Sequence, residues 1–441
     1  MSVLTWADLA GRRVAVWGVG VEGKASLRRL RADGGDPVLV DRSAGVLDDG
    51  TPVVGLGEGG LDLLRQAEVV VKSPGISPYG DEAGSVERAG AQLVGGLGLW
   101  LAGTDRDRVL CVTGTKGKST TTSIAAGLLA GLGVSHRVGG NIGSCPWDPE
   151  LEVDDAGADP LWVVEVSSYQ AHDVVLGPKV VAVASLGEDH LPWHAGTVEV
   201  YHRDKLSLCT RPGVRHVVAD GTDPALRERA ALLGPDVEWV TEDGGTWTLT
   251  GRLLGAHNRR NAEIARRALD ALGVPGLTDE ALLAKAFEDF VPLPSRLTPV
   301  AEADGVLFVD DSISTNVVSA VAAVRSFPGR RVALLVGGLA RDIDYRPLAD
   351  VARTDDVRVV TMPTNGPVIS RVLRAEGVAD VVDCPDLDAA VRTAFDWARP
   401  DGVVVLSPAA ASFDLFADYR SRGEAFSAAA RGVAARWVDS V

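Results

Sequence analysis

The residues best suited to phosphate chemistry lie in the segment VTGTKGKSTTTS, residues 112–123. This segment ends in the Gly-Lys-Ser of a phosphate-binding loop, but only two residues separate Gly114 from Gly117, where the common pattern has four. It follows an apolar run and begins a stretch of helical period, so its backbone N–H groups would attract an anion. Lys118 is predicted to reach the β- and γ-phosphates and Ser119 to bind Mg²⁺. A surface turn with incidental lysines is the alternative.

A second glycine-rich turn, VWGVGVEGKAS at residues 16–26, contains a complete G-x-G-x-x-G. It also joins an apolar run to a helical stretch, and Asp41 ends the next apolar run, about where an acid binds ribose in dinucleotide-binding folds. By itself this turn predicts a nucleotide-like ligand. An NAD-linked oxidoreductase is one alternative, and a turn that binds nothing is another.

Glu165 ends the apolar run of the segment VVEVSSYQ. Burying an unpaired charge is costly, so this carboxylate needs a partner, and a metal ion at the neighbouring phosphate loop would serve. Capping of the following helix is the alternative. The segment 186–208 adds Asp189, His190 and Lys205, but no paired cysteines or HExxH motif support a zinc site there. A single histidine in this segment would more often be a structural hydrogen-bonding group.

Short apolar runs that alternate with amphipathic stretches must position these residues. Continuous runs rich in Val and Leu are typical of buried parallel strands, so the fold class is α/β throughout. Ligands of such sheets bind beyond the carboxyl ends of the strands. Composition shifts predict three domains, residues 1–102, 103–296 and 297–441. The predicted strands lie within residues 12–18, 36–41, 67–73, 107–114, 160–168, 179–185, 305–312, 330–338 and 402–408.

The bulk composition excludes several classes of function. A formal net charge of −16, without a basic stripe, argues against a nucleic-acid partner. No apolar run approaches the length of a membrane span, and the start of the chain does not have the pattern of a secretory signal. Four widely spaced cysteines are typical of a reducing compartment, so a cytoplasmic protein is expected.

Five motifs in order, TGTKGKS, GGNIG, EVSSYQ, EDH…K and GAHNRRNA, resemble those of the Mur ligases. These are ATP-dependent enzymes that add amino acids during peptidoglycan synthesis, and the resemblance spans nearly all of the chain. The chain is most similar to the branch that adds glutamate to UDP-N-acetylmuramoyl-L-alanine. The resemblance implies a Rossmann-like UDP-binding domain, a central P-loop ATPase domain and a C-terminal Rossmann-like domain, in a monomer. It leaves the oxidoreductase and a catalytically inactive nucleotide-binding subunit as remote alternatives.

The resemblance implies an ATP site in which the short glycine spacing is normal. By similarity, Ser119 and Glu165 hold one Mg²⁺ and His190 a second. Lys205 matches a lysine that is carbamylated by CO₂, which converts a cation into an anion able to bind metal. The expected catalytic residues are Lys118, Glu165, His190 and Lys205. The ATP-binding residues implied are Gly114, Thr115, Lys116, Gly117, Lys118, Ser119, Thr120, Asn258, Asn261, Arg296 and Asp311.

The first glycine-rich turn would then bind UDP rather than NAD. The chain departs from the family at Glu22, whose position is usually occupied by a small or hydroxyl-bearing residue. The residues implied in binding the UDP substrate are Gly20, Val21, Glu22, Asp41, Ser73, Pro74, Gly75 and Asn141.

The incoming amino acid would be bound by the third domain, where the chain differs most from the family. Ile313 in DSISTN and Arg341 in GGLARDIDY both stand where D-glutamate-adding members have lysine. Loss of a charge suggests that the carboxylates of glutamate are bound differently. The chain resembles a variant branch that adds L-glutamate and leaves inversion to a separate epimerase. D-glutamate addition with an altered pocket is the alternative. The implied glutamate-binding residues are Thr315, Arg341, Ser412 and Tyr419.

Overall fold

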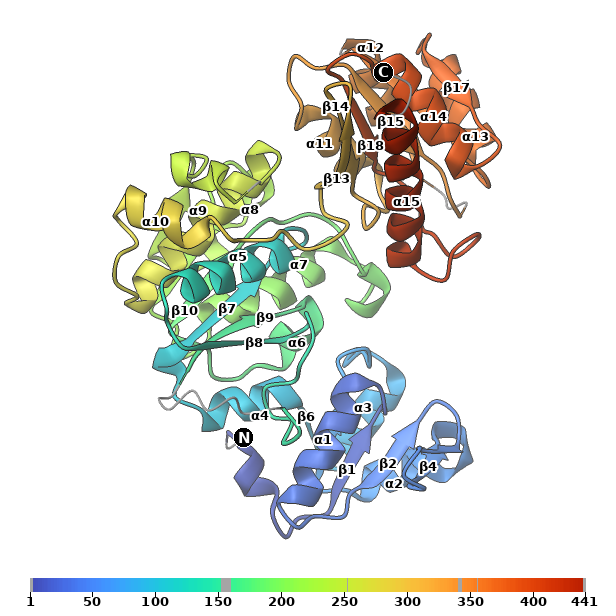
Figure 1. The fold of residues 1–441 in the computed structure, drawn as a ribbon. Coiled ribbons are helices and arrows are strands. Elements are labelled where there is room, and N and C mark those ends of the chain that lie inside the picture. The colour runs from blue at the N-terminus through green and yellow to red at the C-terminus, as the bar shows by residue number, and fades with distance from the viewer. Residues whose placement is uncertain (1–2, 152–159, 252, 340–342, 355, 439–441) are drawn as a thin grey trace. The chain divides into compact units, whose positions relative to one another are not determined.

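The computed structural model describes residues 3–151, 160–251, 253–339, 343–354 and 356–438 (Figure 1). The chain divides into two compact units, one formed by Met1–Gly251 with Arg260–Phe290 and the other by Arg252–Arg259 with Val291–Val441. The first unit contains two six-stranded sheets and the second contains one. All nine predicted strands are present, which confirms the α/β class.

The first sheet has the strand order β3-β4-β2-β1-β5-β6, and its central pairs β2-β1-β5 are parallel. The glycine-rich turn connects the central strand β1 to α1, so this turn lies at the carboxyl edge of the sheet. The strands are β1 Val14–Trp17, β2 Val38–Asp41, β3 Gly45–Val46, β4 Pro52–Gly55, β5 Val69–Lys72 and β6 Gln92–Gly95. The α-helices are α1 Val21–Ala32, α2 Leu61–Gln66, α3 Asp81–Arg88 and α4 Gly96–Gly103.

The second sheet is parallel, in the order β12-β11-β10-β7-β9-β8. The chain passes from β7 to β8 and β9 on one side and then to β10 on the other, so the loop after β7 lies where the crossovers reverse. The strands are β7 Val109–Thr113, β8 His136–Gly140, β9 Leu161–Glu165, β10 Val180–Val183, β11 His216–Asp220 and β12 Val237–Val240. The α-helices are α5 Lys118–Gly131, α6 Ser168–Asp173, α7 Val198–Leu206, α8 Pro224–Glu228, α9 Ala256–Leu272 and α10 Glu280–Phe287.

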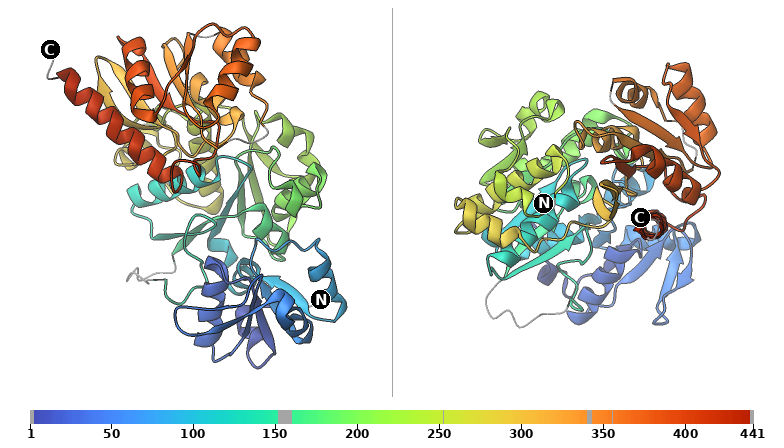
Figure 2. Two further views of the ribbon diagram at one scale, coloured as in Figure 1. Left: turned by 90° about the vertical axis from the view of Figure 1, so that its right-hand side faces the viewer. Right: turned by 45° about the horizontal axis from the view of Figure 1, so that its top comes forward.

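The third sheet has the order β13-β14-β18-β15-β16-β17, with an antiparallel hairpin, β13-β14, at one edge. The C-terminal helix α15 packs against β13 and α14 (Figure 2). The strands are β13 Thr298–Ala303, β14 Val306–Asp310, β15 Val332–Val336, β16 Val357–Thr361, β17 Val381–Asp383 and β18 Val403–Leu406. The α-helices are α11 Val317–Arg325, α12 Arg346–Thr354, α13 Gly366–Ala375, α14 Leu387–Ala398 and α15 Tyr419–Val438.

The central strands are buried along their whole length, as parallel strands covered on both faces must be. Polar groups therefore gather where the strands end, and the predicted phosphate-binding residues follow β7. Within the described residues, no helix combines the length and apolar character that crossing a bilayer requires. The four cysteines are all unpaired thiols, and three of them are buried.

Candidate active site

The phosphate loop runs from Gly114 to Ser119, between β7 and α5, and its two glycines are required by its shape. Gly114 has φ 145°, and a Cβ there would lie 2.9 Å from the backbone nitrogen of Ser185. Gly117 has φ 82° and caps the start of α5, where a Cβ would lie 3.0 Å from Asn261 Oδ1. Side chains are strained at such φ values, so only glycine fits both positions. The two-residue spacing therefore produces a tight turn that ends at a helix N-terminus, as an anion site requires.

Two lysines converge on one carbonyl oxygen of this loop. Lys118 Nζ and Lys205 Nζ each donate to the Gly114 carbonyl oxygen at 2.9 Å, and Lys118 also donates to Thr115 O at 3.2 Å. Lys205 lies on α7 and is only 2% exposed. Burial, together with the charge of Lys118, holds the pKa of Lys205 well below its usual range. The neutral amine of Lys205 is therefore easier to reach than that of an ordinary lysine.

Glu165 presents an unshared carboxylate oxygen beside this loop, at the end of β9. It is 1% exposed, and its Oε1 accepts a hydrogen bond of 2.6 Å from Asn141 Nδ2. Its Oε2 has no hydrogen-bond partner among the described residues. A buried carboxylate oxygen without a partner is costly, so this atom fits a cation. Asn141, predicted to bind the UDP substrate, thus also orients the predicted metal ligand.

His190 lies in the loop after β10, with φ 51°, a conformation that is uncommon for a residue other than glycine. Its Nε2 is 3.7 Å from Asp189 Oδ1, and Lys116 Nζ donates to Asp189 Oδ2 at 3.4 Å. Burial lowers the pKa of His190, Asp189 opposes this shift, and Lys118 and Lys116 add to it. The neutral imidazole that results is the form that binds a metal ion.

No single group of described side chains in this site forms a complete Mg²⁺ site. Within the described residues, no three His, Cys, Asp or Glu side chains are grouped as a ready metal site. Glu165 Oε2 fits a cation on its own, while Ser119 and Thr120 lie half-buried in the first turn of α5. A magnesium ion bound here would therefore draw its remaining ligands from the Ser119 hydroxyl, from substrate phosphate and from further oxygen donors.

The turn of the first sheet is held by two hydrogen bonds from residues of the predicted UDP site. Asp41 Oδ2 accepts from the Val19 backbone nitrogen at 2.7 Å, and Ser73 Oγ donates to Gly18 O at 2.7 Å. Gly20 is the N-cap of α1. Val21 is exposed in its first turn, so this loop presents backbone rather than packed side chains.

Pro74 and Gly75 follow Ser73 in the loop after β5. Trp193 Nε1 donates to the Pro74 carbonyl oxygen at 2.9 Å, and Trp193 stacks on Tyr169 with ring centroids 4.5 Å apart. Trp193 comes three residues after His190. The loop of the first sheet is thus tied to the segment that carries the predicted metal-binding histidine.

In the second unit, Arg296 and Asp311 occupy unusual environments. Arg296 lies between Ser295 and Leu297, which have φ of 60° and 52°. Left-handed residues on both sides of Arg296 are strained, and such strain is concentrated at functional sites. Asp311 is buried and accepts from Ser407 Oγ at 2.7 Å, and burial raises its pKa to about 7. Asn258 donates to Leu254 O within the same unit, whereas Asn261 belongs to the first unit.

Of the predicted glutamate-binding residues, Thr315 is half-buried ahead of α11 and Ser412 is buried after β18. Tyr419 begins α15, where its hydroxyl accepts from Arg420 Nε at 3.3 Å. Arg341 lies outside the described residues.

Two protein-family models match this chain. The model of the Mur ligase middle domain matches residues 112–249, and the model of the Mur ligase glutamate ligase domain matches residues 295–410. The chain belongs to the Mur ligase family. This confirms the resemblance inferred from the five motifs and the prediction of a ligase, and no finding supports the oxidoreductase.

Two relatives and one solved structure show how far this similarity extends. Over 97% of this chain and 98% of the relative, the chain is 38% identical to a UDP-N-acetylmuramoyl-L-alanine–L-glutamate ligase of a Micromonospora species. A ligase of the same name from Xanthomonas axonopodis pv. citri is 39% identical, with 95% of each chain covered. The crystal structure of the UDP-N-acetylmuramate-alanine ligase of Thermotoga maritima aligns with a TM-score of 0.55 at 16% identity, over 96% of this chain and all of that one. This last likeness shows the Mur ligase fold.

Sequence reasoning missed Tyr201, which organises the phosphate loop of this Mur ligase. Its hydroxyl lies 2.9 Å from Thr115 Oγ1, which also accepts from the Gly187 backbone nitrogen at 2.9 Å. The Tyr201 ring lies 5.2 Å from Lys205 Nζ. Tyr201 precedes Lys205 by one helical turn, and that spacing is the signal that could have identified it.

Arg422, on α15, was also missed. It is 2% exposed, and its Nη2 donates to Ser312 O at 2.9 Å and to Ala410 O at 3.0 Å. Its Nε and Nη1 have no partner within the described part of the chain, and burial lowers its pKa to about 10. Arg422 thus joins two of the loops in which glutamate-binding residues were predicted, and it supplies a positive charge next to the loop that contains Ile313.

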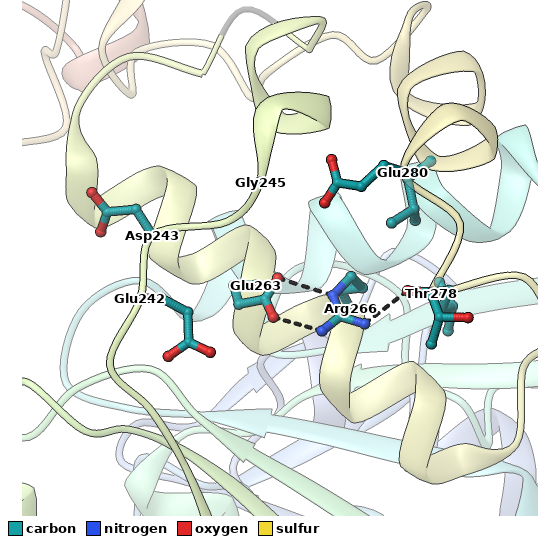
Figure 3. A pocket seen from close by; sticks show the side chains of 9 residues that line it. Glu242, Asp243, Gly245, Glu263, Arg266, Thr278 and Glu280 are labelled. Carbon is teal, nitrogen blue, oxygen red and sulfur yellow. Dashed lines mark hydrogen bonds and ion pairs between the residues drawn. The ribbon is translucent and has the colours of Figure 1, made fainter.

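A pocket of 450 Å³ elsewhere in the first unit contains none of the predicted site residues (Figure 3). Its central charges satisfy one another, because Arg266 bonds both oxygens of Glu263, at 2.6 and 2.9 Å, and the Leu277 carbonyl oxygen at 2.7 Å. These bonds use the charges of both Glu263 and Arg266, so the pair offers little to a ligand. We therefore assign this pocket no function.

Proposed function

We propose that this Mur ligase adds L-glutamate to UDP-N-acetylmuramoyl-L-alanine, with ATP as the energy source. The observation that carries the chemistry is the meeting of Lys118 and Lys205 at the Gly114 carbonyl oxygen. Lys118, at the N-terminus of α5, supplies the positive charge that suits the transfer of a phosphoryl group, and Lys205 supplies the amine for the carbamate proposed below. The names of the full-length relatives support the choice of substrates.

The reaction proceeds in two steps that the site residues can support. The alanine carboxylate of the nucleotide substrate attacks the γ-phosphorus of ATP, giving an acyl phosphate and ADP. The glutamate amine then attacks the acyl carbon, loses a proton, and expels inorganic phosphate. Lys118 stabilises the charge on the phosphoryl oxygens during transfer, with Mg²⁺, when bound, neutralising further charge. Thr115, Lys116 and Thr120 would complete the phosphate-binding loop.

Lys205 would act as a carbamate. Only a neutral amine adds to CO₂, and the burial that lowers the pKa of Lys205 favours that form. The addition forms an N–C bond, releases one proton and leaves an anion at the buried end of the side chain. Glu165, His190 and Ser119 are the further ligands that would hold two magnesium ions with it. The paired metals are a proposal supported by the unpartnered Glu165 oxygen.

The nucleotide substrate would be bound by the first sheet, through Gly20, Val21 and Glu22 in the turn, Asp41, and Ser73 to Gly75. Asn141 would contact the same substrate. Asn258, Asn261, Arg296 and Asp311 are the further proposed ATP-binding residues. Thr315, Ser412, Tyr419 and Arg341 are the proposed glutamate-binding residues.

The preference for L-glutamate is supported by the names of the relatives and by the loss of the lysine at Ile313. The product would then need inversion by a separate epimerase. Addition of D-glutamate remains the competing proposal for the same site. We expect a single copy of the chain to act, in the cytoplasm.

The decisive experiment supplies UDP-N-acetylmuramoyl-L-alanine and ATP with either L- or D-glutamate and measures release of inorganic phosphate. We expect release with L-glutamate and little with D-glutamate. The reverse preference would overturn the stereochemical proposal, and release with neither would overturn the choice of substrates. Omission of the nucleotide substrate is the control for futile ATP hydrolysis.

A further inference from the structure

An acid occupies the first turn of α1, beside the turn that is proposed to bind a diphosphate. Glu22 follows the N-cap Gly20 by two residues, so its backbone nitrogen belongs to the group of N–H donors at this helix end. A diphosphate bound at these donors and an ionised Glu22 would compete for the same positive potential. A carboxylate in this place weakens an anion site unless its charge is removed.

The hydrogen bonds of Glu22 use only one of its two oxygens. Gln170 Nε2 donates to Glu22 Oε1 at 2.6 Å. The orientation of the Gln170 amide is settled by Ser167, whose backbone nitrogen can only donate and bonds Gln170 Oε1 at 2.9 Å. Glu22 Oε2 has no hydrogen-bond partner among the described residues. This second oxygen is therefore free to carry a proton and to donate it in a hydrogen bond.

The groups that surround Glu22 favour its neutral form. Asp173 on α6 places a second negative charge near it, while the hydrogen bond from Gln170 and the charge of Lys72 on β5 favour the ionised form. Lys72 Nζ, however, lies 2.6 Å from Asp173 Oδ2, and both side chains are almost fully buried. Its charge is thus largely committed to Asp173. Burial is the largest influence and, reinforced by Asp173, it outweighs the Gln170 hydrogen bond and raises the pKa of Glu22 to about 7.

We propose that Glu22 is a binding residue that contacts the diphosphate of the nucleotide substrate as a neutral acid, through a hydrogen bond donated by Oε2–H. A protonated carboxyl group is both a donor and an acceptor, whereas a carboxylate only accepts. Binding of the nucleotide takes one proton from solvent onto the fraction of Glu22 that is ionised, and the proton leaves when the nucleotide dissociates. This inference rests on the proposed function, because that function places the diphosphate at this turn.

The test measures binding of UDP-N-acetylmuramoyl-L-alanine to the full-length protein by calorimetry, without ATP or glutamate. Titrations at pH 8 in two buffers of different ionisation enthalpy report the protons taken up. We expect uptake approaching one proton for the unmodified protein and none for Glu22→Gln, whose amide donates without titrating. Above the pKa of Glu22, Kd of the unmodified protein should rise about tenfold per pH unit, while that of Glu22→Gln stays flat.

Two further variants distinguish hydrogen-bond donation by Glu22 from a general effect of its charge. Glu22→Ala removes both the charge and the donor, so at low pH it should bind about tenfold more weakly than Glu22→Gln. Glu87→Gln, an exposed change on α3 in the same part of the chain, should retain proton uptake. Thermal unfolding of each variant checks folding, and Glu22→Thr replaces Glu22→Gln if the latter does not fold.

Three results would overturn the inference. Proton uptake that persists in Glu22→Gln would assign the proton to another group. Equal affinity of Glu22→Ala and Glu22→Gln at low pH would show that Oε2 donates no hydrogen bond. If the unmodified protein does not bind the nucleotide at all, the proposed function fails as well, and this outcome is distinct from the first two.

Discussion

The two glycine-rich turns of the first unit use the same backbone device with opposite side-chain charges. Each connects a central parallel strand to a helix, and in each a lysine directly follows the last glycine. Lys24 follows Gly23 and is exposed, whereas Lys118 follows Gly117 and its Nζ bonds the Gly114 carbonyl oxygen. The same short motif thus directs its lysine to solvent in one turn and to the loop interior in the other.

The charged residues around the two turns also differ. The turn of the first sheet is accompanied by Glu22 and Asp41, and the turn of the second sheet by Lys116 and Lys118. Backbone N–H groups at a helix start attract phosphate in either case. Cations next to them stabilise the charge of a phosphoryl group in transfer, whereas the acidic side chains of the first turn add no such stabilisation. We therefore expect the first turn to bind the nucleotide substrate and the second turn to support transfer of a phosphoryl group from ATP.

The largest effect is expected for Lys118→Ala. Removing the lysine that stabilises the transferring phosphoryl group should lower the rate of phosphate release by about 10³-fold. The matched control is Lys24→Ala in the other turn, which should leave that rate almost unchanged. Equal losses in the two variants, measured under saturating substrates, would contradict the division of roles.

Lys205→Ala should lower phosphate release by about 10²-fold, because the variant cannot form the metal-binding anion. Added short carboxylates should restore part of the activity by occupying the space that the side chain leaves. Phosphate release is measured with and without formate or acetate, and Lys118→Ala serves as the control that should not respond. Full activity without any added carboxylate would refute the carbamate.

Gly23→Ala should destabilise the protein more than Gly20→Ser. A Cβ on Gly23 would overlap the Gly18 carbonyl oxygen, whereas one on Gly20 would meet no atom within 4 Å. Overpacking of this kind costs about 1–3 kcal/mol, while serine is a favoured N-cap and should cost little. Chemical denaturation measures the free energy of unfolding, and equal values for both variants would show that the turn relaxes freely.

The smallest effect is expected for Asp41→Asn. The carboxylate of Asp41 accepts hydrogen bonds from the backbone nitrogens of Val19, at 2.7 Å, and Arg42, at 2.6 Å. An amide can accept only one of them, so the turn should loosen and KM for the nucleotide substrate should rise about tenfold. KM for ATP should not change, since ATP is assigned to the other turn. A parallel rise in both constants would contradict separate nucleotide sites.

Much of the fold could be predicted because it depends on local pattern. Continuous apolar runs such as Val109–Thr113 and Val332–Val336 became buried strands, and the phosphate loop followed one of them. The family was inferred from motifs that retain their order along the chain, and the matching models confirmed it. The roles of the individual site residues and the three domain boundaries stay predictions.

Residues that act across long separations in the sequence were harder to predict. Arg422 bonds Ser312, 110 residues away, and Tyr201 contacts Thr115, 86 residues away. No spacing rule connects such pairs, because their proximity results from the order of strands in a sheet and the packing of helices on it. The effect of burial on Lys205, Glu22 and Asp311 was likewise not visible, since it depends on what surrounds each group.

The sequence by itself determined the class of fold, the position of the phosphate loop and membership of the Mur ligase family, because apolar periodicity and glycine spacing act over a few residues. Only the tertiary structure decided that Lys118 and Lys205 meet at one carbonyl oxygen and that Glu22 has an unshared oxygen beside a helix start. Hydrogen bonds and desolvation operate over a few ångströms of space, and the packing of the sheets and helices sets those distances.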